Sequence, residues 1–231
     1  MMLATWAAVA LTQSAPSFAA IEKSKYEAFA ALTSFSGTYE VMTIPKDGAG
    51  SKQTVSILIA PTGRLTRIVS NGLPQFETAW TKAQRWTVFY PERRYSLAES
   101  STDLPLTLPY APLAAEPGSI NFTMDQSGVR FAADPAPTVS APVKETVEGK
   151  SVRKIVCSSR NQSTGGEMSI SQWFDGEGWQ LRRFELVLKS KGAVALTIRG
   201  NLVSDTPTPT VSESSFRLPD SIRQTFTRSG L

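Results

Sequence analysis

Apolar and polar residues alternate along most of this chain, in short runs separated by turn-forming residues. Thr54 to Ala60 places Val55, Ile57 and Ile59 on one side, and Ala193 to Ile198 repeats the pattern. A period of two is typical of a strand with one buried face. The spacing of these runs predicts about ten or eleven short antiparallel strands.

Large aromatic residues crowd Arg85 to Leu97, which we interpret as a hairpin. Trp86, Val88 and Tyr90 occupy alternate positions of its first strand. Pro91 belongs in the turn, because it fixes φ and lacks the N–H that a ladder needs. One face of this hairpin therefore has enough apolar area to cover a core or to line a cavity.

A helical period marks Ile21 to Phe35. Apolar residues, among them Phe29 and Leu32, recur there at intervals of three, four and seven, which predicts an amphipathic helix ended by Ser36-Gly37. One amphipathic helix cannot bury its own apolar stripe, so we expect it to pack on the sheet.

These patterns predict a mainly β fold: a single curved antiparallel sheet with the N-terminal helix and loops against one face. A sheet of this size curls, and its concave side forms a trough for apolar side chains. Residues 20–231 are expected to form one domain with a polar, frayed C-terminal tail. The proline-rich segment Ser100 to Gly118 is expected to pack over the sheet, either as a static cover or as a mobile lid.

The first residues have the pattern of a targeting segment. An apolar run from Met2 to Leu11 is followed by small residues around Ala19, which predicts a secretory signal peptide over residues 1–19. The run is too short to span a bilayer. We therefore expect an exported, periplasmic or secreted protein that begins near Ala20.

The composition excludes several classes of catalytic and metal-binding site. The chain has no histidine, which excludes Ser/His/Asp and Cys/His catalysis and histidine-ligated metals. Cys157 is the only cysteine, so no intrachain disulfide and no cysteine metal cluster can form, and a buried thiol is expected. The net charge of +4 is spread along the chain, which favours solubility and permits weak contact with an anionic membrane surface.

Three short constellations have simple structural interpretations. Ser151 and Lys154 match S-x-x-K, but they lie in a strand pattern and the partner motifs of serine acylases are absent. Asp175 to Gly178 has too few carboxylates for a calcium loop and is expected to be a turn. The pairs Arg93-Arg94 and Arg182-Arg183 are expected to be solvated strand ends or, alternatively, contacts for an anionic headgroup. Export argues against nucleic acid as a partner.

The order of these features resembles the LolA/LolB-type fold of bacterial periplasmic lipoprotein carriers and their LolA-like relatives, including the N-terminal domain of the sensor RseB. The resemblance rests on the exported start, on the helix and on five aromatic or turn motifs, which are Leu32 to Tyr39, Trp86…Tyr90-Pro91…Tyr95, Glu148-Gly149-Lys150, Trp173-Phe174-Asp175…Trp179…Leu181-Arg182 and Phe216…Leu218-Pro219.

The resemblance implies an unclosed β-barrel whose concave face, capped by the helix and loops, accepts acyl chains or another apolar surface. It also implies a carrier that uses no cofactor or metal and catalyses no reaction. The residues predicted to contact the ligand are apolar side chains of the helix and the strands: Phe29, Leu32, Tyr39, Val41, Val55, Ile57, Trp86, Val88, Tyr90, Tyr95, Leu97, Phe184, Leu186, Val194, Leu196 and Ile198.

Three functions remain open at this stage. The first is a monomeric carrier or binding protein for a lipid, a lipoprotein acyl chain or another apolar ligand. The second is a cell-envelope interaction or sensor module that uses the same sheet to grip a protein partner. The third is an enzyme, which the absence of histidine weighs against without excluding carboxylate chemistry. The apolar set serves the first two, because every β domain needs such side chains to fill a core.

Overall fold

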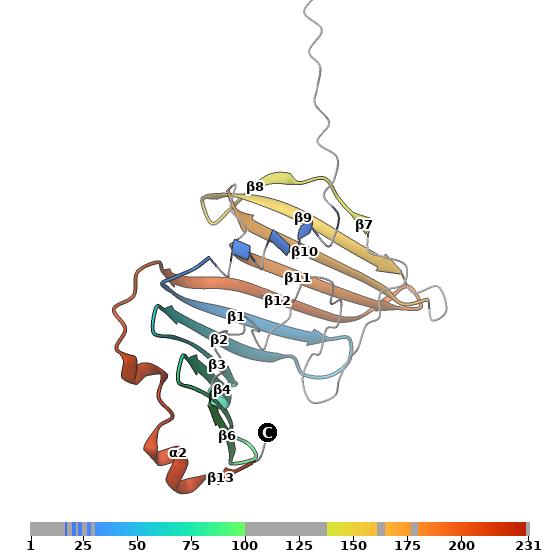
Figure 1. The fold of residues 1–231 in the computed structure, drawn as a ribbon. Coiled ribbons are helices and arrows are strands. Elements are labelled where there is room, and N and C mark those ends of the chain that lie inside the picture. Colours follow the sequence, from blue (N-terminus) through green and yellow to red (C-terminus); the bar gives the residue numbers. More distant parts are fainter. Residues whose placement is uncertain are drawn as a thin grey trace, which may run out of the picture.

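The computed structural model of the chain describes residues 17, 20–21, 23–24, 27–28, 31–99, 138–160, 165–176 and 180–229. Within these ranges the protein is mainly β, with one curved sheet of 13 strands that does not close into a barrel (Figure 1). The predicted loop at 100–118, most of the predicted signal peptide and Phe29 lie outside the described residues.

The strands follow the predicted runs closely, and two of the 13 have only two residues each. Their bounds are β1 (Phe35–Pro45), β2 (Ser51–Ala60), β3 (Gly63–Ser70), β4 (Leu73–Thr81), β5 (Gln84–Phe89), β6 (Arg94–Glu99), β7 (Thr138–Val139), β8 (Val143–Val147), β9 (Lys150–Arg160), β10 (Glu167–Asp175), β11 (Leu181–Ser190), β12 (Ala193–Thr206) and β13 (Thr227–Arg228).

The sheet consists of two meanders joined at its centre. Strands β1 to β6 pair in sequence, β9 to β12 do likewise, and β1 pairs with β12 to connect them. Neighbouring strands are antiparallel except β13, which runs parallel to β6. Short strands stand at both ends, with β13 beside β6 and β7 and β8 beside β9. Short edge strands limit the exposed ladder that would otherwise pair with another chain.

The N-terminal helix ends earlier than the sequence analysis expected. The described residues from Ala20 to Ala28 are helical, and the N–H of Ala31 donates to the carbonyl of Glu27. Phe35 is not helical, because it begins β1 and pairs with Ile59. The ladder and the burial of the Phe35 ring, which is 3% exposed, outweigh its place on the helical stripe.

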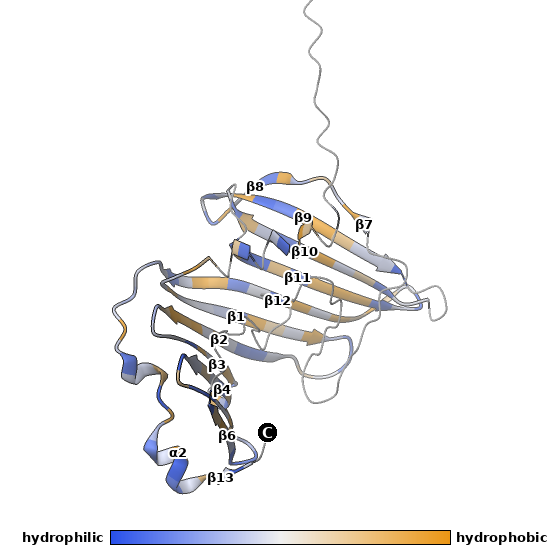
Figure 2. Cartoon of the chain, in the orientation of Figure 1, coloured by the Kyte–Doolittle hydropathy of each residue, from blue (hydrophilic) through white to orange (hydrophobic). Residues whose placement is uncertain are grey.

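The side chains of the sheet form two cores on opposite faces. We call the first the Tyr39 face, where Tyr39 lies opposite Val55 and Phe35 lies opposite Ile59. Its buried side chains come from β9 to β12, β1 and β2, and Ile21 packs against them. Along these strands hydrophobic and hydrophilic residues alternate (Figure 2), as the period of two requires.

The second core lies on the opposite face, which we call the Trp86 face. Ile57 pairs with Thr66, Thr66 with Thr78 and Thr78 with Thr87, so these threonines share the Tyr39 face. Trp86 is next to Thr87 and therefore points the other way, where it is 1% exposed.

A C-terminal layer, residues 213–228, covers the Trp86 face of β3 to β6. It consists of the 3₁₀ helix η1 (Glu213–Phe216), the helix α2 (Asp220–Thr225) and β13. Phe216, Leu218 and Ile222 are buried against Trp86. The indole N–H of Trp86 donates to the Phe216 carbonyl at 2.7 Å. This end was expected to fray because its sequence is polar, but three apolar anchors and the ladder with β6 hold it to the sheet.

Candidate functional site

The structure divides the predicted ligand-contacting residues between the two faces. Those on the Tyr39 face, buried or partly buried, are Leu32, Tyr39, Val41, Val55, Ile57, Phe184, Leu186, Leu196 and Ile198. Those packed against the C-terminal layer on the Trp86 face are Trp86, Val88, Tyr90, Tyr95 and Leu97. Val194 is 42% exposed near the start of β12. The single lining predicted from the sequence is thus two separate sets.

Further residues of the Tyr39 face were not singled out as ligand contacts by the sequence analysis. Apart from Ile21, which is helical, they lie on strands, so the strand pairing would have identified them had it been known. These residues are Ile21, Phe35, Ile59, Ile155, Cys157, Met168, Ile170, Phe174, Leu181, Leu188 and Leu202. Cys157 is fully buried among them, as expected for a thiol inside a core.

Tyr39 supplies a polar group within this apolar layer. Its hydroxyl donates to the Leu181 carbonyl at 2.8 Å, across the β1, β12 and β11 strands. Burial of the ring raises the pKa of Tyr39 well above its ordinary value, so the phenol stays neutral in the physiological range. Tyr39 therefore adds no charge to the apolar layer.

Three buried threonines interrupt the Tyr39 face where it continues onto β3 to β5. Thr66, Thr78 and Thr87 are 2%, 1% and 7% exposed. The Thr78 hydroxyl donates to the Trp86 carbonyl at 2.9 Å and lies 3.0 Å from the Thr87 hydroxyl. Apolar residues also continue on this face beyond β2: strand pairing places Ile68, Phe76 and Trp80 there, and Ile68 packs against the first core.

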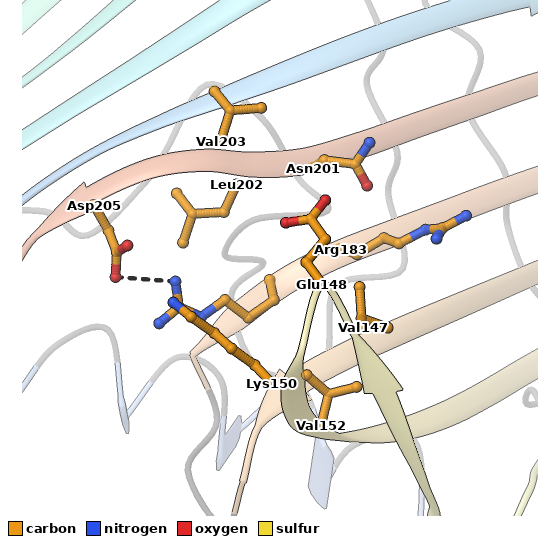
Figure 3. Close-up of a pocket in the computed structure, with 10 residues that line it drawn as sticks. Val147, Glu148, Lys150, Val152, Arg183, Asn201, Leu202, Val203 and Asp205 are labelled. Carbon is orange, nitrogen blue, oxygen red and sulfur yellow. Dashed lines mark hydrogen bonds and ion pairs between the residues drawn. The ribbon is translucent and has the colours of Figure 1, made fainter.

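A second candidate site is a pocket beside the turn that joins β8 to β9 (Figure 3). We call it the Arg183 pocket; its volume is about 110 Å³. It is lined by four strands, β8, β9, β11 and β12, and by the turn. The lining side chains are those of Val147, Glu148, Lys150, Val152, Arg182, Arg183, Asn201, Leu202, Val203 and Asp205.

Two adjacent β-bulges shape this pocket. Trp173 pairs with Arg183 but Phe174 pairs with Leu181, so Arg182 is an extra residue in β11. Thr38 pairs with Ser204 but Tyr39 pairs with Leu202, so Val203 is an extra residue in β12. Bulges bend a strand and redirect its side chains, and both extra residues line the pocket.

Arg182 is held by two carboxylates. Its guanidinium lies 2.5 Å from Asp175 and 2.9 Å from Asp205, and its side chain is 16% exposed. Asp175, the first residue of the predicted turn, ends β10, and residues 177 and 178 of that turn lie outside the described residues. Within the described ranges, no group of three His, Cys, Asp or Glu side chains that could hold a metal ion is found.

Arg183 is packed against an aromatic ring. Its guanidinium carbon lies 4.8 Å from the centre of the Trp173 ring, and the Lys154 ammonium lies 4.9 Å from it. The Trp173 indole N–H donates to Glu145 at 2.8 Å. This hydrogen bond, with the nearby Lys154, lowers the pKa of Glu145.

No family model matches this sequence, and no curated protein does. The solved structures that it resembles include an uncharacterised conserved protein from Thermus thermophilus, with 13% identity, a TM-score of 0.46 and coverage of 90% of this chain and 97% of that one. Lipoprotein LppX from Mycobacterium tuberculosis has 16% identity and a TM-score of 0.41, and the match covers 84% of this chain and 97% of that one. A LolA superfamily protein from Nitrosomonas europaea has 10% identity and a TM-score of 0.36, and the match covers 88% of this chain and 99% of that one. No helix within the described ranges is long and apolar enough to cross a membrane.

Proposed function

We propose that this protein is an exported carrier or binding protein that holds a lipid, a lipoprotein acyl chain or another apolar ligand against the Tyr39 face. The observation that carries the proposal is the continuous apolar layer from β9 to β2 on one side of an open sheet. Among the described residues, only Ile21 and Leu32 come from outside the sheet to pack on it.

The chemistry of this layer suits a hydrocarbon chain. Burying a methylene group yields about 0.8 kcal/mol and requires no hydrogen-bond partner from the protein. The hydroxyl of Tyr39 is already bonded to Leu181 and carries no charge. The buried threonines of β3 to β5 mark where such a chain would meet polar groups instead.

The first test is native mass spectrometry of the secreted protein purified without detergent, followed by extraction of bound lipid. A bound acyl species would support the proposal and name the ligand class. An empty protein that also fails to take up a fluorescent fatty acid would contradict it.

A matched pair of variants tests where the ligand binds. Leu196 is half-buried on the Tyr39 face and Leu97 is half-buried on the Trp86 face. Leu196→Glu should abolish fatty-acid uptake, whereas Leu97→Glu should leave it unchanged, with both folds checked by circular dichroism. Uptake that survives Leu196→Glu in a folded protein would count against the Tyr39 face as the binding surface.

The alternative is an envelope module that grips a protein partner. Met42 and Ile44 favour it, because they lie at alternate positions of β1, opposite to the Tyr39 face, and are 38% and 41% exposed. This function predicts no bound lipid, together with loss of partner binding in Met42→Asp. For either function we propose a monomer in the periplasm, which size-exclusion chromatography and cell fractionation would test.

A further inference from the structure

We propose that the ligand of the Tyr39 face is an anionic amphiphile, a lipid with a carboxylate or phosphate headgroup, and that Trp80 and Arg85 hold this headgroup. The inference rests on the proposed function and deepens it, because it names the class of ligand and the part of the sheet where its polar end lies.

Strand pairing places both residues on the Tyr39 face. Ile59 of the apolar layer is paired with Arg64, and Arg64 is paired with Trp80. Trp80 is in turn paired with Arg85. Directly opposite residues of antiparallel strands share a face, and neighbouring strands are about 4.8 Å apart, so Trp80 is roughly 10 Å from Ile59. An acyl chain on the apolar layer can therefore be continuous with a headgroup at Trp80 and Arg85.

Trp80 has a buried hydrogen-bond donor without an acceptor. Its side chain is 5% exposed, and its Nε1 is buried with no hydrogen-bond partner. The other two tryptophans within the described ranges are satisfied, since Trp86 donates to the Phe216 carbonyl and Trp173 donates to Glu145. A buried donor left unpaired is costly, and an oxygen of a bound headgroup would supply the missing acceptor.

The indole of Trp80 differs from a guanidinium that has one unpaired nitrogen. A guanidinium has five N–H donors, so Arg182 has an unpaired Nε and is still bonded to Asp175 and Asp205 through its terminal nitrogens. An indole has one donor and no acceptor. The unpaired Nε1 therefore leaves the whole Trp80 side chain without a hydrogen bond.

Arg85 places a cation beside this indole. Its guanidinium carbon lies 5.6 Å from the centre of the Trp80 ring, a distance at which a cation is attracted to the ring. Arg85 is exposed, and within the described residues it forms no ion pair. A carboxylate or a phosphate offers more than one oxygen, so one oxygen can accept from the indole while another pairs with Arg85.

The charges on this part of the sheet favour an anion. Strands β3 to β5 contain one acidic residue, Glu77, which is paired with Val88 on the Trp86 face and bonded there to Arg67. The Tyr39 face of the same three strands has Arg64 and Arg85 and no carboxylate. A negative headgroup therefore meets attraction and no like charge from these strands.

Displacement of Nile red, a neutral apolar dye, tests the headgroup with ligands that share one twelve-carbon chain. Dodecanoate and dodecyl phosphate should bind about tenfold or more tightly than 1-dodecanol, the effect of one charge-assisted hydrogen bond. The tighter of the two anions identifies the headgroup as a carboxylate or a phosphate.

Two variants test the residues that hold the headgroup. Trp80→Phe keeps an aromatic ring but removes the N–H, and Arg85→Gln removes the charge. Each should lower the affinity for the anions about tenfold and so remove most of the preference over 1-dodecanol. Arg85 is exposed, so Arg85→Gln is expected to fold even where Trp80→Phe does not. The matched control is Arg199→Gln, which removes the same charge opposite Met42, on the other face of the sheet, and should keep the preference.

The outcomes separate this inference from the function on which it rests. If the protein binds neither the dye nor any of the three ligands, both are overturned. If 1-dodecanol binds as well as the two anions, or if folded Arg85→Gln keeps the preference, only the headgroup site is overturned. An equal loss of preference in Arg199→Gln would also overturn the headgroup site, because it would show only a general effect of surface charge.

Discussion

The two parts of this sheet have their main apolar cores on opposite faces. Strands β9 to β12, β1 and β2 bury the Tyr39 face, where the apolar layer meets Ile21. Strands β3 to β6 bury the Trp86 face beneath the C-terminal layer. The change occurs between β2 and β3, where Ile57 is paired with Thr66. Both cores are buried: Ile21 packs on the first, and the C-terminal layer fills the second.

This comparison shows why a list of alternating apolar residues does not define a binding site. Trp86 and Tyr39 both belong to strands with a period of two, and both are buried. They differ in what covers them: Ile21, which is near Tyr39 in the sequence, packs on the Tyr39 face, whereas Trp86 is bonded to Phe216, 130 residues away.

The largest expected effect is from Trp86→Ala. It removes a fully buried ring and the hydrogen bond to the Phe216 carbonyl, and should lower the free energy of unfolding by about 3–5 kcal/mol. Urea denaturation measures this. If the comparison of faces is right, fatty-acid uptake by the folded fraction stays at the parent level; a selective loss of uptake would place Trp86 with the ligand instead.

A smaller effect is expected from Gly200→Ala on the Tyr39 face. Gly200 is paired with Phe184, and a methyl group there would clash with the Phe184 ring. Overpacking of this kind lowers the free energy of unfolding by about 1–3 kcal/mol. The double variant with Phe184→Leu should recover part of the loss, because the two positions interact; additive losses in a double-mutant cycle would show that the ring does not rest on Gly200.

Tyr90→Phe should have a modest effect at the Trp86 end. The Tyr90 hydroxyl donates to Glu77 at 2.7 Å, and Arg67 holds the other oxygen of the same carboxylate at 2.7 Å. Loss of the hydroxyl should lower the free energy of unfolding by about 0.5–1.5 kcal/mol, as urea denaturation would measure. Burial and the bond to Glu77 raise the pKa of Tyr90. The contribution of the Tyr90 hydroxyl to stability is therefore complete below its unfolded-state pKa of about 10 and is lost as the pH rises through its folded-state pKa. The stability of the variant should consequently fall less in strong alkali than that of the parent.

The smallest effect is expected from Glu145→Gln beside Trp173. The hydrogen bond from Trp173 and the nearby Lys154 lower the pKa of this carboxylate. A carboxylate whose pKa is lower in the folded state stabilises the fold at pH values above its unfolded-state pKa. This stabilisation is lost as the pH falls through the folded-state pKa. Thermal melts between about pH 3 and pH 6 should therefore be slightly less pH-dependent in the variant, and an unchanged pH dependence would contradict this assignment.

Much of the fold was predictable, because alternation is a local signal. The runs at Thr54 to Ala60 and Arg85 to Leu97 appear as β2 and as the β5–β6 hairpin, and Arg93 adopts a positive φ of 49° within the predicted turn. The early start of β1 at Phe35 was not predictable, since the same residue fits a helical stripe and only its pairing with Ile59 decides between the two.

The candidate site was less predictable, for two physical reasons. Alternation gives each strand two faces, but it does not say which face meets Ile21 and which meets Phe216. The bulges are also invisible in the sequence: nothing in Leu181-Arg182-Arg183 shows that Arg182 is the extra residue, although this determines which arginine turns to Asp175 and Asp205.

The attachment of the C-terminal layer has a consequence for the order in which the protein matures. The N–H of Ser229 donates to the Tyr95 carbonyl at 2.8 Å, and β13 pairs with β6. Contacts between such distant segments form late and slow folding. Strands β3 to β6 are synthesised before residues 213–229, so their core stays incomplete until those residues follow. This core therefore depends on a segment made more than 100 residues later.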